Sequence, residues 1–212
     1  MLEFGAGYQH SVRLAHKDFQ PRWGHTISLN YALNPANHNF SHLVSIYGKG
    51  FFPGVVRHHS LSVALAYQTS LKGFNHEDAL SNLAFHSGRL VPRGFYTSQI
   101  ENRNYVATSI NYALPVWYPD LGCSLIQFKR VRLNLGFDYA SFDSKKPIPL
   151  GKTGLITTNT HRQNICSYGG DITIDFTLFR MPAAATASLT LSVYQPHGGD
   201  RPFVSVGVGM PF

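Results

Sequence analysis

The chain ends on Arg201-Pro-Phe-Val-Ser-Val-Gly-Val-Gly-Met-Pro-Phe212, and this stretch gives the clearest indication of the fold class. Every second side chain in it is apolar, namely Val204, Val206, Val208, Met210 and Phe212. Successive side chains of a strand point to opposite sides, so a period of two indicates a strand with one apolar and one polar face. We expect the stretch to be the closing strand of a β-barrel that lies in a membrane.

The same alternation recurs along most of the chain, and no amphipathic helix is visible. It predicts about nine strands, over residues 2–9, 26–33, 41–52, 61–68, 107–116, 131–139, 171–178, 187–194 and 203–212. Short connections alternate with longer ones, and loops are expected at 72–103 and 144–163. This order is typical of an antiparallel, up-and-down transmembrane β-barrel.

Composition is compatible with this interpretation but does not decide it. Only 14% of the residues are charged and 13% are aromatic, which suits a barrel with aromatic girdles and also suits a soluble β-sandwich. The chain lacks a run of about eighteen apolar residues, so we expect no transmembrane helix. It also does not open on a secretory signal, so we expect such a signal in a longer precursor if the protein is secreted.

Sequence motifs argue against several functions. The net charge is +7, but the basic residues form no block on a helix, so we expect no nucleic-acid partner. Cys123 and Cys166 lack the spacing of metal ligands, and the histidines are scattered, so neither a metal site nor a cofactor is predicted. No nucleophile elbow or phosphate-binding loop occurs, so we do not expect an enzyme.

Aromatic residues occur beside the expected short turns. If the C-terminus lies on the periplasmic side, the turns at 51–55, 117–122 and 181–183 lie there as well. Phe51, Phe52, Trp117 and Tyr118 would then form an aromatic belt at one membrane interface.

Two motifs carry a resemblance to a known family. Leu90-Val-Pro-Arg-Gly-Phe95 lies in the first long loop, and Leu135-Gly-Phe-Asp-Tyr-Ala140 lies on an expected strand. Five expected strands follow the first motif. The chain resembles the C-terminal part of the barrel in the Omp85 superfamily, the bacterial surface antigen type. Arg93, Gly94 and Phe95 match that family's loop motif, and Asp138 resembles its acidic strand residue.

The resemblance implies that the loop folds back into the barrel lumen. Arg93 would then meet Asp138 in a bidentate ion pair, and Gly94 would allow a tight turn at the loop tip. The alternative is that Arg93 is a solvated loop residue and that Asp138 pairs with Arg132 or another lumen group. Two departures from the family's pattern are Pro92 before the arginine and Ala140 where the family usually has glycine.

The resemblance also implies a function and partners. Proteins of this family reside in the bacterial outer membrane and assist the insertion or translocation of other proteins, so outer-membrane lipid and unfolded substrate proteins are the expected partners. Phe212 resembles the terminal signal by which barrels are recognised for assembly. Family barrels have more strands than nine, so residues 1–212 are expected to be a C-terminal barrel fragment that lacks N-terminal strands and periplasmic domains.

Two alternatives remain from the sequence alone. One is an outer-membrane porin or ligand-binding barrel without an assembly role. The other is a soluble β-sandwich that acts as a binding module, because a sandwich strand shows the same alternation as a barrel strand.

Overall fold

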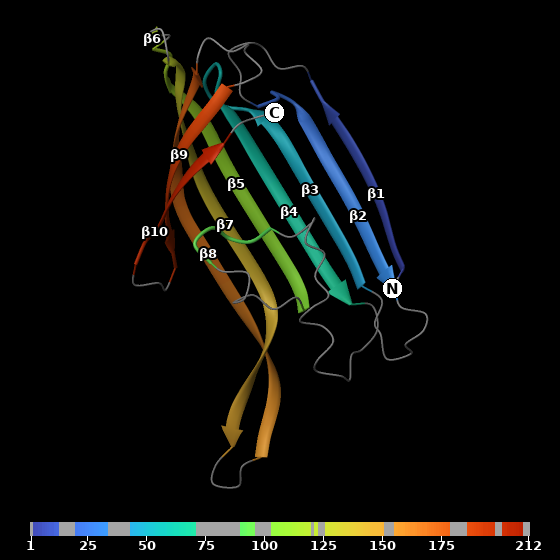
Figure 1. The fold of residues 1–212 in the computed structure, drawn as a ribbon. Helices are drawn as coiled ribbons and strands as arrows, with labels where there is room; N and C mark the ends of the chain where they lie inside the picture. The colour runs from blue at the N-terminus through green and yellow to red at the C-terminus, as the bar shows by residue number, and fades with distance from the viewer. Residues whose placement is uncertain are drawn as a thin grey trace.

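The computed structural model describes residues 2–12, 20–33, 43–70, 90–95, 103–119, 121–122, 126–150, 155–178, 186–197 and 201–209. They form one antiparallel sheet of ten strands (Figure 1). The strands are β1 (Leu2–Ser11), β2 (Gly24–Leu33), β3 (Leu43–Pro53), β4 (Ser60–Ser70), β5 (Arg103–Trp117), β6 (Leu121–Gly122), β7 (Ile126–Leu150), β8 (Leu155–Leu178), β9 (Thr186–Pro196) and β10 (Phe203–Gly209). In these ranges no helix is long and apolar enough to cross a membrane.

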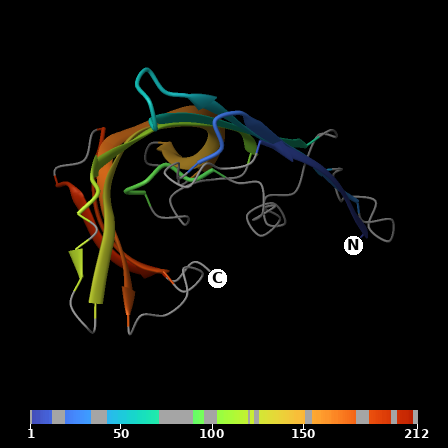
Figure 2. The same ribbon diagram turned by 90° about the horizontal axis from the view of Figure 1, so that it is seen from above.

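The strands follow one another across the sheet in chain order. The order is β1-β2-β3-β4-β5-β7-β8-β9-β10, and the two-residue β6 pairs with β7. The predicted all-β, up-and-down arrangement is therefore confirmed. Figure 2 shows the sheet as a curved trough, with β1 at one edge and β10 at the other. The described strands do not close into a barrel.

The two faces of the sheet differ in polarity. On β7, Leu135 and Phe137 are 49% and 44% exposed, whereas their neighbours Gly136 and Asp138 are buried. The strand registers place further exposed apolar side chains on the same face, including Ile27, Leu29, Ile46, Leu65, Ile110, Ile172, Leu189, Leu191 and Val193. The other face lines the concave side of the trough, where it meets residues 90–95 (Figure 2).

β10, which the sequence predicted to be the closing strand, fits this division. Val204, Val206 and Val208 pair with Val193, Leu191 and Leu189 and extend the apolar face to the sheet edge, where they are 58–72% exposed. Met210 and Phe212 lie outside the described residues. Val204, Val206 and Val208 thus have the alternation that the sequence predicted for them.

The expected loop at 144–163 is wrong. β7 and β8 pair along their whole lengths, from Ile126↔Leu178 to Leu150↔Leu155, and the hairpin extends past the neighbouring strands (Figure 1). The run Ile156-Thr-Thr-Asn-Thr160 is rich in β-branched residues, which favour strands.

The aromatic residues predicted for one interface do not all lie on the same face of the sheet. Phe52 and Trp117 are exposed by 40% and 57% on the apolar face, and the Trp23 ring stands 6.0 Å from that of Phe52. Phe51 instead pairs with Ser62 on the polar face, where Lys49 Nζ lies 4.9 Å from its ring centroid. Phe51 therefore does not belong to an outward-facing belt.

Candidate functional site

The tip of the first long loop forms a tight turn on the concave face. The Phe95 amide donates a hydrogen bond to the Pro92 carbonyl at 3.2 Å, and Gly94 has φ of +89°. This φ fits the third position of a type II turn, where a side chain would be strained. A Cβ at Gly94 would also lie 3.0 Å from Pro196 Cγ. The turn thus needs glycine at this position.

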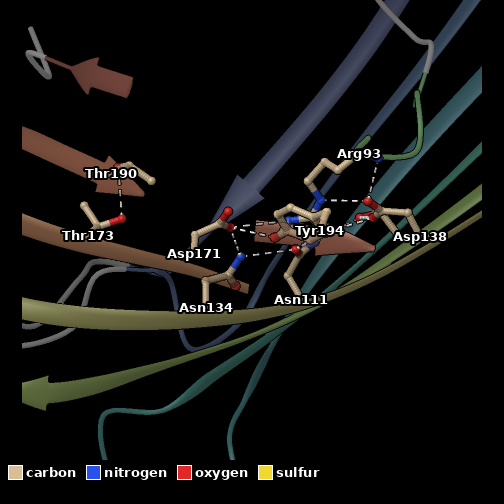
Figure 3. A network of polar contacts seen from close by, with 9 residues as sticks. Arg93, Asn111, Asn134, Asp138, Asp171, Thr173, Thr190 and Tyr194 are labelled. Atoms are coloured by element: carbon tan, nitrogen blue, oxygen red, sulfur yellow. Dashed lines mark hydrogen bonds and ion pairs between the residues drawn. The ribbon is translucent and has the colours of Figure 1, made fainter. Parts of the chain in front are cut away.

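The turn presents Arg93 to Asp138 on β7 (Figure 3). Arg93 Nε donates to Asp138 Oδ2 at 2.7 Å and Nη2 donates to Oδ1 at 2.9 Å. The backbone amide of Arg93 adds a third bond to Oδ2 at 3.0 Å. The predicted contact between Arg93 and Asp138 is therefore present, and it is bidentate, the geometry in which arginine binds carboxylate most specifically.

Three further side chains hold the guanidinium, and sequence reasoning did not assign any of them to this site. Arg93 Nη2 donates to Asn111 Oδ1 at 2.7 Å, and Nη1 donates to the Tyr194 hydroxyl. The Tyr194 hydroxyl donates in turn to Asp171 Oδ2 at 2.8 Å, and Arg93 Cζ lies 4.3 Å from the Tyr194 ring centroid. In the sequence they stand out only as residues at the alternate, polar positions of strands β5, β8 and β9.

The ion pair is largely shielded from solvent. The Asp138 side chain is 4% exposed and that of Arg93 is 29% exposed. Ser109 Oγ donates to Asp138 Oδ1 at 2.6 Å, so the carboxylate is bonded at both oxygens. Burial disfavours the charge on the loop residue Arg93, but the bond to Asp138 and its negative charge outweigh this, so the pKa of Arg93 is raised.

Apolar contacts also anchor the loop. Leu90, Val91 and Phe95 pack against a buried cluster of five residues: Ala66, Tyr105, Ala107, Ala140 and Phe142. The Tyr105 hydroxyl donates to the Leu90 carbonyl. Phe95, the last residue of the predicted motif, thus contributes packing to the site.

Arg132 is not the partner of Asp138. Arg132 Nη2 donates to Asp175 Oδ1 at 3.2 Å, and Arg130 Nε donates to the other oxygen of the same carboxylate. The alternative pairing of Asp138 with Arg132 is therefore not formed. Among the described residues no group of His, Cys, Asp and Glu is arranged to hold a metal ion.

Gly136 makes room for the guanidinium. A Cβ at Gly136 would lie 2.3 Å from Arg93 Nη2 and 2.7 Å from Cζ. The glycine that matters for this contact therefore stands two residues before Asp138. Ala140, two residues after it, is fully buried in the apolar cluster instead.

We expect Gly136→Ala to displace Arg93 and lower the free energy of unfolding by about 1–3 kcal/mol, because the added methyl overlaps a held side chain. The matched control is Gly48→Ala on β3, where a Cβ meets nothing within 4 Å. Chemical denaturation of the two variants gives the unfolding midpoints that are compared. Equal midpoints for the two variants would show that Arg93 does not occupy this position.

Comparison with known proteins found no match among family models, curated proteins or solved structures.

Proposed function

We propose that the chain forms part of an outer-membrane β-barrel of the Omp85 type, which assists the insertion or translocation of other proteins. The observation that carries the proposal is the Arg93 loop tip, bound through a bidentate ion pair to Asp138 on the polar face of an up-and-down sheet. In this proposal the polar face becomes a lumen, and the loop is a plug that rearranges when a substrate strand passes.

The apolar face of the sheet supports a membrane setting. Its exposed residues span β2 to β10, and a surface of this kind is too large to be an ordinary feature of a soluble monomer. Hydrocarbon contact would make such a face favourable, as on the outside of membrane barrels. The described strands form a single sheet, so no second sheet covers that face as a β-sandwich would require.

The open edges fit the same proposal. Among the strands that the structure describes, β1 and β10 each pair with one neighbour, and unpaired strand edges are costly in lipid. The proposal therefore includes further strands that pair with both edges. An assembly factor would use such an edge to receive a substrate strand, because backbone groups pair without regard to sequence.

The second candidate is a porin or ligand-binding barrel without an assembly role. A polar cavity on the concave face favours it. The two candidates differ in what passes through the lumen: a polypeptide strand for the first and a small solute for the second.

An insertion assay distinguishes the candidates. A small unfolded barrel protein is diluted from urea into vesicles, and its folding is followed by heat-modifiable gel migration. We expect faster folding with vesicles that contain the protein than with empty vesicles. We expect the Arg93→Met variant to change this rate, whereas Arg57→Gln, an exposed turn residue, should leave it unchanged.

Vesicle swelling in small sugars serves as the second readout. Swelling without any effect on folding would contradict the assembly role and support the porin. Neither effect, from protein that is inserted, would contradict both candidates.

A further inference from the structure

The tip of the Arg93 loop also contacts one edge of the sheet. Gly94 lies against the end of β9 and the start of β10: a Cβ at Gly94 would lie 3.0 Å from Pro196 Cγ and 3.4 Å from Phe203 Cβ. Pro196 is buried there, and Phe203 is 36% exposed. The turn that carries Arg93 therefore touches the hairpin of β9 and β10 as well as Asp138 in the middle of the sheet.

A row of residues in register crosses the concave face beneath the loop tip. Asn111 on β5 pairs with Gly136 on β7, which pairs in turn with Gly169 on β8. Gly169 pairs with Tyr194 on β9. The Arg93 guanidinium lies over Gly136, and a Cβ at Gly169 would lie 2.8 Å from Tyr194 Cδ1. The two glycines thus leave the space in which the guanidinium and the tyrosine ring meet.

Tyr194 connects the loop to the edge hairpin. The residue is 1% exposed, and its ring centroid lies 4.3 Å from Arg93 Cζ (Figure 3). Its hydroxyl accepts from Arg93 Nη1 and donates to Asp171 Oδ2 at 2.8 Å. The attraction between a cation and an aromatic ring is stronger where both are shielded from water. Since Phe203 pairs in register with Tyr194, these contacts act where β10 begins.

The opposite edge of the sheet provides an internal comparison. β1 has ten residues and β10 has seven, and each pairs with one neighbour among the described strands. The hydrogen bonds of the Arg93 side chain go to β5, β7 and β9, whereas β1 and β2 form the far edge (Figure 2). Edge strands open by local fluctuations, and contacts that must break first make the opening rarer.

We propose that the Arg93 turn controls the opening of the β9–β10 edge. While the turn is bound, Arg93 joins Tyr194 on β9 to Asp138 on β7, and Gly94 packs against Phe203. When the turn leaves, that end of the hairpin is free to open, and the backbone of β10 becomes available to another strand. The restraint itself does not depend on any function, but its use in admitting a substrate strand rests on the proposed function.

Hydrogen exchange of the folded protein in detergent, measured on its peptides by mass spectrometry, tests the proposal. In Arg93→Met we expect exchange in β10 and in the second half of β9 to accelerate about tenfold more than exchange in β1 and β2, because local opening no longer breaks the Arg93 contacts. A general loss of stability would accelerate both edges by the same factor, and that result would overturn the proposal.

Tyr194→Phe makes the test independent of whether Arg93→Met folds. The variant keeps the ring and removes the hydroxyl that Arg93 binds, so we expect a smaller acceleration at the same edge. Unchanged exchange at β9 and β10 in this variant would overturn the proposal.

Leu43→Ala is the control for a defect elsewhere in the sheet. Leu43 is 3% exposed and pairs with Ala32 on β2, so its truncation should accelerate exchange in β1 and β2 and leave β9 and β10 unchanged. If Leu43→Ala accelerated β9 and β10 more than β1 and β2, that edge would be weak for reasons unrelated to Arg93, and the proposal would be overturned.

The insertion assay separates the restraint from its use. We expect Tyr194→Phe to change the rate at which the substrate barrel folds. Faster exchange at β9 and β10 without any change in that rate would support the restraint and overturn its role in admitting a strand.

Discussion

Replacement of Arg93 by Met is expected to lower the free energy of unfolding by about 3 kcal/mol or more. The variant keeps the length of the side chain but leaves the carboxylate of Asp138, which is 4% exposed, without its cation. Ser109 remains as a side-chain donor to it, which is too little to balance a buried charge. Chemical denaturation of Arg93→Met and of the unaltered protein measures the difference.

A double-mutant cycle isolates the pair. Asp138→Asn preserves the shape of the partner and removes its charge, and we expect the double variant to lose much less than the sum of the two single variants. The expected coupling energy is about 2 kcal/mol, within the range for residues in one network. Hydrogen exchange at the Arg93 amide, which donates to Asp138, should accelerate in both single variants.

The Arg93→Lys variant tests whether a positive charge alone is enough to hold the loop. Lysine keeps the charge but cannot reach Asp138, Asn111 and Tyr194 together with a rigid fork, so we expect little rescue. Arg57→Gln is the control for general loss of charge. A coupling energy near zero, or full rescue by lysine, would contradict the network.

Leu191→Arg is expected to destabilise the protein folded in lipid vesicles by about 2–4 kcal/mol, the cost of a cation on the hydrocarbon face of a barrel. Leu191 is 42% exposed on the apolar face, in register with Ile172 and Val206. Folding titrations from urea into vesicles give the value.

Its matched control is the next residue along β9. Ser192 faces the concave side and pairs in register with Asp171, so an arginine at 192 meets a carboxylate instead of lipid. We expect Ser192→Arg to change the stability of the protein in vesicles only slightly. Equal losses for the two variants would mean that lipid does not contact the apolar face.

The sequence predicted the strands well because alternation of apolar and polar residues is a local property. The β9 and β10 patterns were readable from single stretches, and both appear as strands with the expected faces. The Arg93–Asp138 contact was predicted from motif resemblance, since forty-five positions separate the two residues and no local pattern joins them.

The remaining site residues could not be predicted because their roles depend on curvature. Asn111, Asp171 and Tyr194 converge on Arg93 only when the sheet bends into a trough, and alternation carries no information on bending. Gly136 looked like any strand glycine, although its missing side chain leaves the space that the guanidinium fills.

The errors have similar causes. Phe51 was assigned with Phe52 because both are aromatic, but adjacent strand residues point to opposite faces, and only the register shows which of the two is outward. The stretch 144–163 was predicted as a loop because it shows no clear alternation of apolar and polar residues. Cross-strand pairing between β7 and β8 outweighed the lack of a local signal.

The most direct test of the central claim, that the apolar face meets lipid while the polar face holds the Arg93 loop, is tryptophan quenching along β9. Single tryptophans are placed at Leu189, Leu191, Val193, Ser188 and Ser192 after Trp23 and Trp117 are replaced by phenylalanine. In vesicles with brominated acyl chains, we predict strong quenching at the first three positions and little at the two serines. Uniform quenching, or none at any position, would contradict the account.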